Sequence, residues 1–165
     1  MHAATQTKPA VLFVCLGNIC RSPMAEGAMR DAAHKAGLDI IVASAGTANY
    51  HIGNAPDPRA IATARAHGVD IGDQIGRQLS ENDFYTFTHI IALDKANIAG
   101  IKARAPRQGK AKVELLLDVL DHRKGVAVPD PYYGDDADFE KCWKTIAEAV
   151  DALVVRFSRL QQNAA

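Results

Sequence analysis

The segment from Cys15 to Ser22 reads C-L-G-N-I-C-R-S and has a spacing of residue types that suits phosphate chemistry. A cysteine opens the segment, Arg21 follows six positions later, and the apolar run 11–14 precedes it. This order predicts a strand, a short loop and a helix, and such a helix start points backbone N–H groups at an anion. A thiolate held among these donors is stabilised as a nucleophile, and a guanidinium can clamp two phosphate oxygens. The segment therefore predicts hydrolysis of phosphate monoesters through a cysteinyl-phosphate.

Other residues of this loop favour the same interpretation. Gly17 and Asn18 tolerate left-handed backbone, which a loop that curls around an anion requires. Ser22 followed by Pro23 predicts a helix N-cap and a first helical residue. A bare Cys-x5-Arg pattern also arises by chance, from a buried cysteine with an arginine nearby. We expect the phosphate to be bound by Leu16, Gly17, Asn18, Ile19, Cys20, Arg21 and Ser22.

Asp130 is the candidate general acid for protonating the leaving oxygen. It lies in V-P-D-P-Y-Y-G, residues 128–134, and the two prolines restrict the backbone on both sides of it. Tyr132 and Tyr133 can wall a slot for a flat aromatic ring and partly exclude water from the carboxyl group. Taken alone, the segment is equally typical of a turn before a helix. Combined with Cys15 and Arg21, the interpretation as an acid is favoured.

Strand-like and helical segments alternate along the chain. Strands are predicted at 10–15, 39–44, 89–93 and 112–116, and helices at 22–36, 57–67, 80–86, 94–103 and 137–161. The alternation predicts a flavodoxin-like α/β fold, a doubly wound four-stranded parallel sheet with helices on both faces. Ligands bind beyond the carboxyl ends of such strands, where the 15–22 loop is expected. Asp94 ends a strand at the same edge and is a candidate to support the loop or Arg21.

Length and composition indicate one domain. We expect it to span 10–162 after a flexible extension at 1–9, within a chain of 165 residues. The formal net charge is zero, which favours neither nucleic acid nor membrane as a partner. No apolar stretch approaches the length of a membrane span, about 20 residues. Three cysteines are too few for a disulfide scaffold and favour the cytoplasm. No Cys/His pairs stand at metal-ligand spacing, so neither metal nor cofactor is expected.

The chain resembles the low-molecular-weight protein tyrosine phosphatases from its first strand to its last helix. Residues 11–23 are similar to the phosphate loop of that family. The further matches are Ser44-Ala45-Gly46, Pro56-Asp57-Pro58-Arg59-Ala60, Arg77-Gln78 and Asp130-Pro131-Tyr132-Tyr133-Gly134. The resemblance implies a phosphotyrosine phosphatase I-type fold that hydrolyses phosphotyrosine and small aryl phosphates. It also implies a phosphotyrosine-containing protein as substrate, a tyrosine kinase as a second partner, and a monomer or weak dimer.

The resemblance also implies the roles of individual residues. Cys15 would be the nucleophile, Arg21 the phosphate clamp and Asp130 the general acid. It further implies that Ser22 would donate to the leaving thiolate, and that Asn18 and Ser44 would hold the loop. Cys20 would form a reversible disulfide with Cys15.

Two positions depart from the family pattern. Gln74 stands where a histidine usually bonds the loop asparagine, and a glutamine can also donate to Asn18. Tyr50 stands where a tryptophan commonly contacts the substrate ring, and we expect it to do so together with Tyr132 and Tyr133.

Two other functions share this sequence pattern. Thiol-coupled arsenate reductases resemble the family but need further cysteines in mid-chain, and none stands between Cys20 and Cys142. A phosphopeptide-binding module would lack a nucleophile or an acid, whereas Cys15 and Asp130 are both present.

Overall fold

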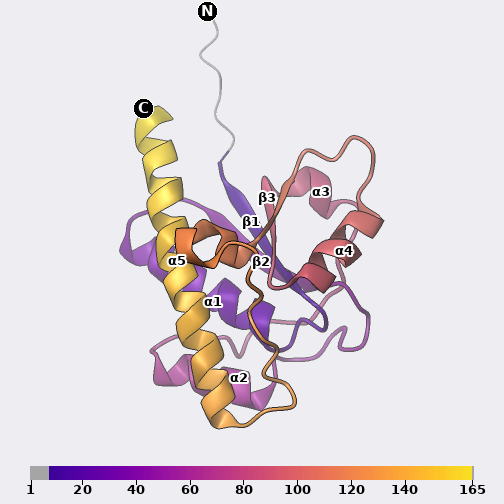
Figure 1. Ribbon diagram of the computed structural model, residues 1–165, viewed down its shortest axis with the longest axis vertical. Helices are drawn as coiled ribbons and strands as arrows, with labels where there is room; N and C mark the ends of the chain where they lie inside the picture. Colours follow the sequence, from indigo (N-terminus) through magenta and orange to yellow (C-terminus); the bar gives the residue numbers. More distant parts are fainter. Residues whose placement is uncertain (1–7, 165) are drawn as a thin grey trace, which may run out of the picture.

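The computed structural model describes residues 8–164, so most of the expected 1–9 extension lies outside the described residues. A parallel sheet forms the centre of the molecule (Figure 1). It has four strands in the order β2-β1-β3-β4. Its strands are β1 (Ala10–Cys15), β2 (Ile41–Gly46), β3 (His89–Ala92) and β4 (Lys112–Leu115). The four predicted strands are confirmed to within two residues: β2 begins and ends two residues later than expected, and β3 and β4 each end one residue earlier.

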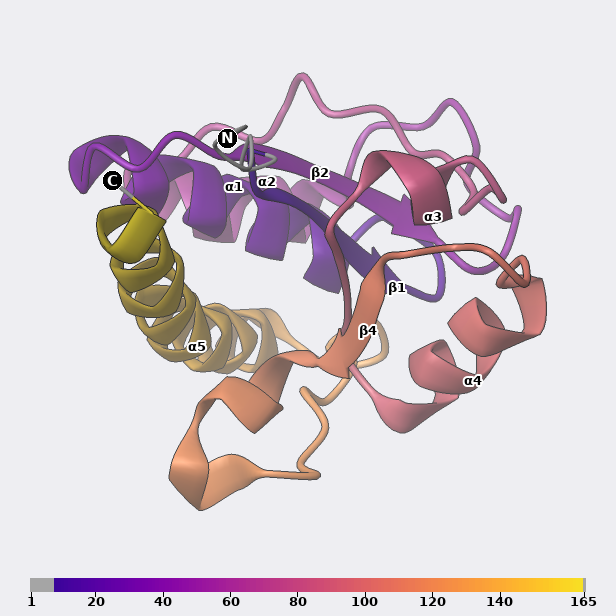
Figure 2. The same ribbon diagram turned by 90° about the horizontal axis from the view of Figure 1, so that it is seen from above.

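Helices cover both faces of this sheet, as the alternating pattern predicts. The helices are α1 (Arg21–Lys35), α2 (Pro58–Ala66), α3 (Asp83–Thr86), α4 (Lys95–Arg104) and α5 (Asp136–Ala164), with 3₁₀ turns η1 (Leu116–Val119) and η2 (Asp121–Arg123). Helices α1 and α5 pack against each other on one side of the sheet, and α3 and α4 lie on the other side (Figure 2). The fold is therefore doubly wound.

Strand β1 lies at the centre and is buried on both faces. Phe13 belongs to the apolar core under α1 and α5, whereas Leu12 and Val14 belong to the core under α3 and α4. This double burial explains the continuous apolar run, because a strand with both faces covered has no polar side. Cys15 ends this rigid strand, so its backbone position is set by the core.

The turn from β1 into α1 differs from two predictions. Helix α1 begins at Arg21, and Ser22 is fully buried within its first turn rather than capping it. Asn18 has the predicted left-handed backbone, with φ of 58°. Gly17 does not, and its lack of a side chain serves a close approach: a Cβ there would lie 3.1 Å from His51 Cδ2. A larger residue at position 17 would therefore have to displace the His51 side chain slightly, and the left-handed backbone predicted for Gly17 is wrong.

Candidate active site

The phosphate loop between β1 and α1 turns its carbonyl groups away from the cavity. The backbone N–H groups of Thr47, Ala48 and Asp57 donate to the carbonyls of Cys15, Leu16 and Ile19, at 2.9, 2.9 and 2.8 Å. Within residues 8–164, none of the N–H groups from Leu16 to Cys20 donates to a protein group. No side chain caps the N-terminus of α1. The arrangement leaves a set of free N–H donors suited to an anion.

The thiol of Cys15 lies at the floor of this loop, next to a hydroxyl. Ser22 Oγ is 3.0 Å from Cys15 Sγ, and both residues are buried. Ser22 also accepts a hydrogen bond from Asn18 Nδ2 at 2.8 Å. The Ser22 side chain does not cap the helix, because it points back to Cys15 at the end of β1. A hydroxyl in this position can donate to a thiolate and stabilise its charge.

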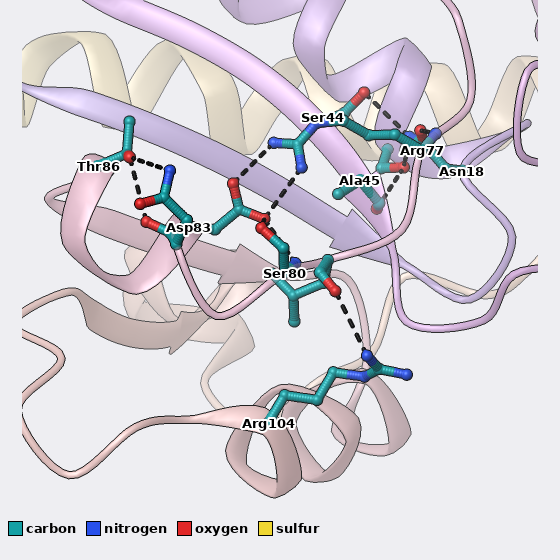
Figure 3. A network of polar contacts seen from close by, with 11 residues as sticks. Asn18, Ser44, Ala45, Arg77, Ser80, Asp83, Thr86 and Arg104 are labelled. Atoms are coloured by element: carbon teal, nitrogen blue, oxygen red, sulfur yellow. Dashed lines mark hydrogen bonds and ion pairs between the residues drawn. The ribbon is translucent and has the colours of Figure 1, made fainter.

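Asn18 connects the phosphate loop to two neighbouring segments. Its Nδ2 donates to Ser44 Oγ at 3.0 Å, and its Oδ1 accepts from the backbone N of Arg77 at 3.0 Å. The guanidinium of Arg77 in turn donates two hydrogen bonds to the Asp83 carboxylate, both 3.0 Å long (Figure 3). Ser44 donates to the buried carboxylate of Glu26 at 2.8 Å. Every hydrogen-bonding atom of the Asn18 side chain is used, so the left-handed turn at this residue is held from both sides.

Gln74 does not replace the expected histidine as a partner of Asn18. Its Nε2 donates to the Pro23 carbonyl at 3.0 Å, and its buried Oε1 has no hydrogen-bond partner. Gln74 therefore does not use its capacity to donate to Asn18. The backbone of Arg77 supplies the donor to Asn18 instead, which needs no particular side chain at position 74.

The guanidinium of Arg21 is buried and is held from one side. Its Nη1 donates to Asp94 Oδ2 at 2.7 Å and to the Val128 carbonyl at 2.9 Å. Its Nη2 lies 3.7 Å from Asp130 Oδ2. Burial disfavours the charged guanidinium, but the Cys15 thiolate, Asp94 and Asp130 outweigh this effect and raise the pKa of Arg21. The side chain stays charged and presents its other edge to the cavity.

One cavity of about 270 Å³ brings together the residues predicted to act on the phosphate and on the ring. Cys15 and Arg21 line its floor, and Asp130 lines its wall with 43% of its side chain exposed. The other lining residues named by the sequence are Leu16, Gly17, Ile19, Cys20, Tyr50, Tyr132 and Tyr133. The remaining predicted site residues do not line the cavity; these are Asn18, Ser22, Ser44 and Asp94. Ser22 and Asp94 contact the lining residues Cys15 and Arg21 directly, and Ser44 is connected to the loop through Asn18.

The second and third cysteines differ in their surroundings. Burial raises the pKa of the Cys20 thiol far above its usual value, and the charges of Asp57, Cys15 and Asp130 raise it further. Burial likewise raises the pKa of Cys142, on α5, to about 12. All three cysteines are free thiols. Cys20 is therefore a protonated neighbour of Cys15.

Several residues of the site carry no local sequence signal. His51 lines the cavity beside Gly17, and the Val128 carbonyl holds Arg21. Glu26 lies in the middle of α1, where a carboxylate ordinarily faces solvent, yet here it is buried. Its partner Ser44 comes from β2, so only the packing of α1 on the sheet shows its role.

The described part of the chain holds neither a cluster of metal ligands nor a helix suited to crossing a membrane. Among residues 8–164, no group of three or more His, Cys, Asp or Glu side chains is arranged to hold a metal ion. None of the described helices combines the length and apolar character needed to cross a membrane.

Comparison with known proteins places this site in a family. A family model described as low molecular weight phosphotyrosine protein phosphatase matches residues 10–165. The phosphatase of that name from Schizosaccharomyces pombe is 41% identical over 136 residues, 81% of this chain and 86% of the relative. A crystal structure of a protein tyrosine phosphatase from Entamoeba histolytica is 35% identical with a TM-score of 0.86, covering 93% of this chain and 99% of that one. A Drosophila arginine phosphatase is 30% identical with a TM-score of 0.83, covering 89% and 96%.

A cysteine at the end of a buried parallel strand, under free N–H donors and beside an arginine, is the arrangement expected of a cysteine-dependent phosphatase. Together with the match over residues 10–165, it shows that this chain belongs to the low molecular weight phosphotyrosine protein phosphatase family. The chain is thus a protein-tyrosine phosphatase by family, and the arsenate reductase alternative is not favoured.

Proposed function

We propose that this enzyme hydrolyses phosphotyrosine and small aryl phosphate monoesters with Cys15 as nucleophile, Arg21 as clamp and Asp130 as general acid. One observation carries the assignment of roles: a single cavity of about 270 Å³ is lined by all three side chains. The thiol and the guanidinium lie where the phosphate would bind, and the carboxyl group lies on the wall where the leaving group would depart.

In the first step the Cys15 thiolate attacks phosphorus. An S–P bond forms as the P–O bond to the aryl group breaks, and the Asp130 carboxyl gives its proton to the departing oxygen. The loop N–H groups and Arg21 bind the equatorial oxygens, where negative charge is spread in the transition state.

In the second step water attacks the phosphorus of the cysteinyl-phosphate. The S–P bond breaks, the electron pair returns to Cys15 Sγ, and the Asp130 carboxylate accepts the proton from water. Ser22 Oγ, 3.0 Å from the sulfur, stabilises the thiolate as it leaves. Phosphate is released, and both side chains regain their starting forms.

The walls of the cavity support an aromatic leaving group. Ile19, Tyr50 and Tyr132 line it with apolar and aromatic surface, which suits a flat ring. A guanidinium leaving group would instead be positioned best by carboxylates, and Asp130 is the one carboxylate in the cavity lining among the described residues. We therefore propose phosphotyrosine rather than phosphoarginine as the substrate, although an arginine phosphatase shares the fold.

The test uses two peptides of identical sequence that carry phosphotyrosine or phosphoarginine. The wild type should turn over the first, and acid quenching should trap a phosphate on the peptide containing Cys15. Cys15→Ser should abolish turnover while retaining phosphate binding, because a serine hydroxyl is a far weaker nucleophile. Asp130→Asn should lower kcat/KM by about 10²–10⁴-fold, the usual span for a lost general acid. Label on another residue, or preference for the phosphoarginine peptide, would overturn the proposal.

We further propose that the protein acts in the cytoplasm, as a monomer or weak dimer, on protein substrates that a tyrosine kinase has phosphorylated. Three free thiols support a reducing compartment. The opening of the cavity supports a protein substrate, because it leaves Tyr50 and Tyr133 70% and 96% exposed to contact flanking peptide.

A further inference from the structure

The loop that carries Asp130 has few anchors of its own. Pro131 is buried, but the residues from Tyr132 to Asp138 are exposed. Within the loop, Tyr132 N donates to Asp130 Oδ1 at 3.1 Å and Gly134 N donates to the Pro131 carbonyl at 2.8 Å. Before Asp130 the segment is anchored at Val128, whose N donates to the Leu93 carbonyl and whose carbonyl accepts from Arg21 Nη1, both at 2.9 Å. After Asp130 the local bonds shape the turn, and an anchor from another element is needed on that side.

Arg59, in the first turn of α2, provides such an anchor. Its Nη2 donates to the Tyr132 carbonyl at 2.9 Å, and its Nη1 donates to the Gly134 carbonyl at 3.2 Å. The guanidinium also lies 5.7 Å from the centre of the Tyr132 ring and 4.5 Å from that of Phe139. One side chain thus holds two carbonyls and one ring of the acid loop.

Asp57 fixes the other end of this contact to the phosphate loop. Its carboxylate accepts from Arg59 Nε and Nη2, both at 3.0 Å, and from the backbone N of Arg59 at 2.8 Å. Its own backbone N donates to the Ile19 carbonyl at 2.8 Å. The hydrogen bond from Arg59 lowers the pKa of Asp57, so the pair remains charged. A continuous path therefore runs from Ile19 through Asp57 and Arg59 to the loop of Asp130.

We infer that Arg59, oriented by Asp57, is a positioning residue that holds the C-terminal side of the acid loop and so keeps the general acid at its distance from the nucleophile. The inference rests on the proposed role of Asp130. Arg59 does not line the cavity and touches no reacting atom, so it acts through the acid loop. A displacement of the acid by about 1 Å is enough to cost on the order of 10²-fold in rate. The loss must be largest where protonation of the leaving group matters most.

The experiment compares kcat/KM for phenyl phosphate, a poor leaving group, and p-nitrophenyl phosphate, a better one. Arg59→Ala should lower kcat/KM for phenyl phosphate by about 10-fold or more, and much less for p-nitrophenyl phosphate. Arg59→Lys should show most of the same loss, because an ammonium group cannot make two hydrogen bonds to the Asp57 carboxylate and also reach the carbonyls of Tyr132 and Gly134. This second variant also serves if Arg59→Ala does not fold. Arg65→Ala, an exposed arginine at the other end of α2, is the matched control and should leave both rates unchanged.

The Asp130→Asn background separates positioning from general damage. Once the acid is absent, Arg59→Ala should cost nothing further for either substrate. Equal losses for both leaving groups, or the same additional loss in the Asp130→Asn background, would overturn the inference. If Asp130→Asn itself shows no dependence on the leaving group, the proposed acid fails instead, so the two failures are distinguishable.

Discussion

The two sides of the active site are built in different ways. The phosphate side is part of the core: Cys15, Asn18 and Arg21 are each 3% exposed, and Ser22 is fully buried. The leaving-group side is at the surface, where Asp130 has 43% of its side chain exposed and Tyr133 is 96% exposed. A buried polar group must have its hydrogen bonds satisfied, which fixes its geometry. The phosphate site is therefore preorganised, whereas the acid depends on a small number of surface contacts.

The largest expected effect comes from changing the buried side at Arg21. Arg21→Lys should lower kcat by about 10³-fold or more, because a point charge cannot clamp the transferring group in a fork. The loss should be the same for good and poor leaving groups, in contrast to changes on the acid side. Steady-state kinetics on a series of aryl phosphates measures both.

Arg156→Lys is the matched control, because Arg156 pairs with Glu114, away from the cavity lining, and should keep normal activity. An Arg21→Lys enzyme that kept a tenth of the wild-type kcat would show that the buried side is not preorganised through this clamp.

A second test of the buried side uses Cys20 and peroxide. Peroxide should oxidise Cys15 to a sulfenic acid, and Cys20 should resolve it as a disulfide that thiols reduce. Because burial raises the pKa of Cys20, its thiolate fraction is small and rises as pH rises, so disulfide formation should accelerate about tenfold per pH unit. Quenched mass spectrometry of the Cys15–Cys20 crosslink, at several pH values, gives this slope.

Cys20→Ser should lose the recovery of activity by thiols, whereas Cys142→Ser should retain it. Equal recovery of the Cys20 variant and the wild type would assign the protective reaction elsewhere. A crosslinking rate that is flat with pH would contradict the protonated state of Cys20.

The smallest effect is expected at the exposed rim. Tyr133→Ala should raise KM for a phosphotyrosine peptide by less than about fivefold and leave kcat nearly unchanged, since most single contacts at a surface contribute under about 1 kcal/mol. Tyr85→Ala, on α3 and 54% exposed, is the control for loss of a surface ring. A large fall in kcat for Tyr133→Ala would mean that this side is as rigid as the core.

The amino-acid sequence by itself determines the architecture and the location of the chemistry. A continuous apolar run predicts a strand that is covered on both faces, such as β1. The alternation of strand-like and helical apolar patterns predicts the order of strands and helices. The Cys15–Arg21 spacing places the proposed nucleophile and the proposed clamp on one loop, since both residues lie within a few positions of a strand end. Local sequence patterns are enough to predict these features, because the periodicity of apolar residues and the length of a short loop depend only on neighbouring residues.

Tertiary structure decides how the residues of the site are held. Ser22 has the local pattern of an N-cap, but packing against β1 and β2 turns its hydroxyl to Cys15. The donor to Asn18 is the backbone of Arg77 and not Gln74, and Arg59 reaches carbonyls more than 70 residues further along the chain. These contacts depend on how α1, α2 and the acid loop pack on the sheet. Backbone donors and carbonyls are the same in every residue, so no residue type in the sequence marks which of them will meet.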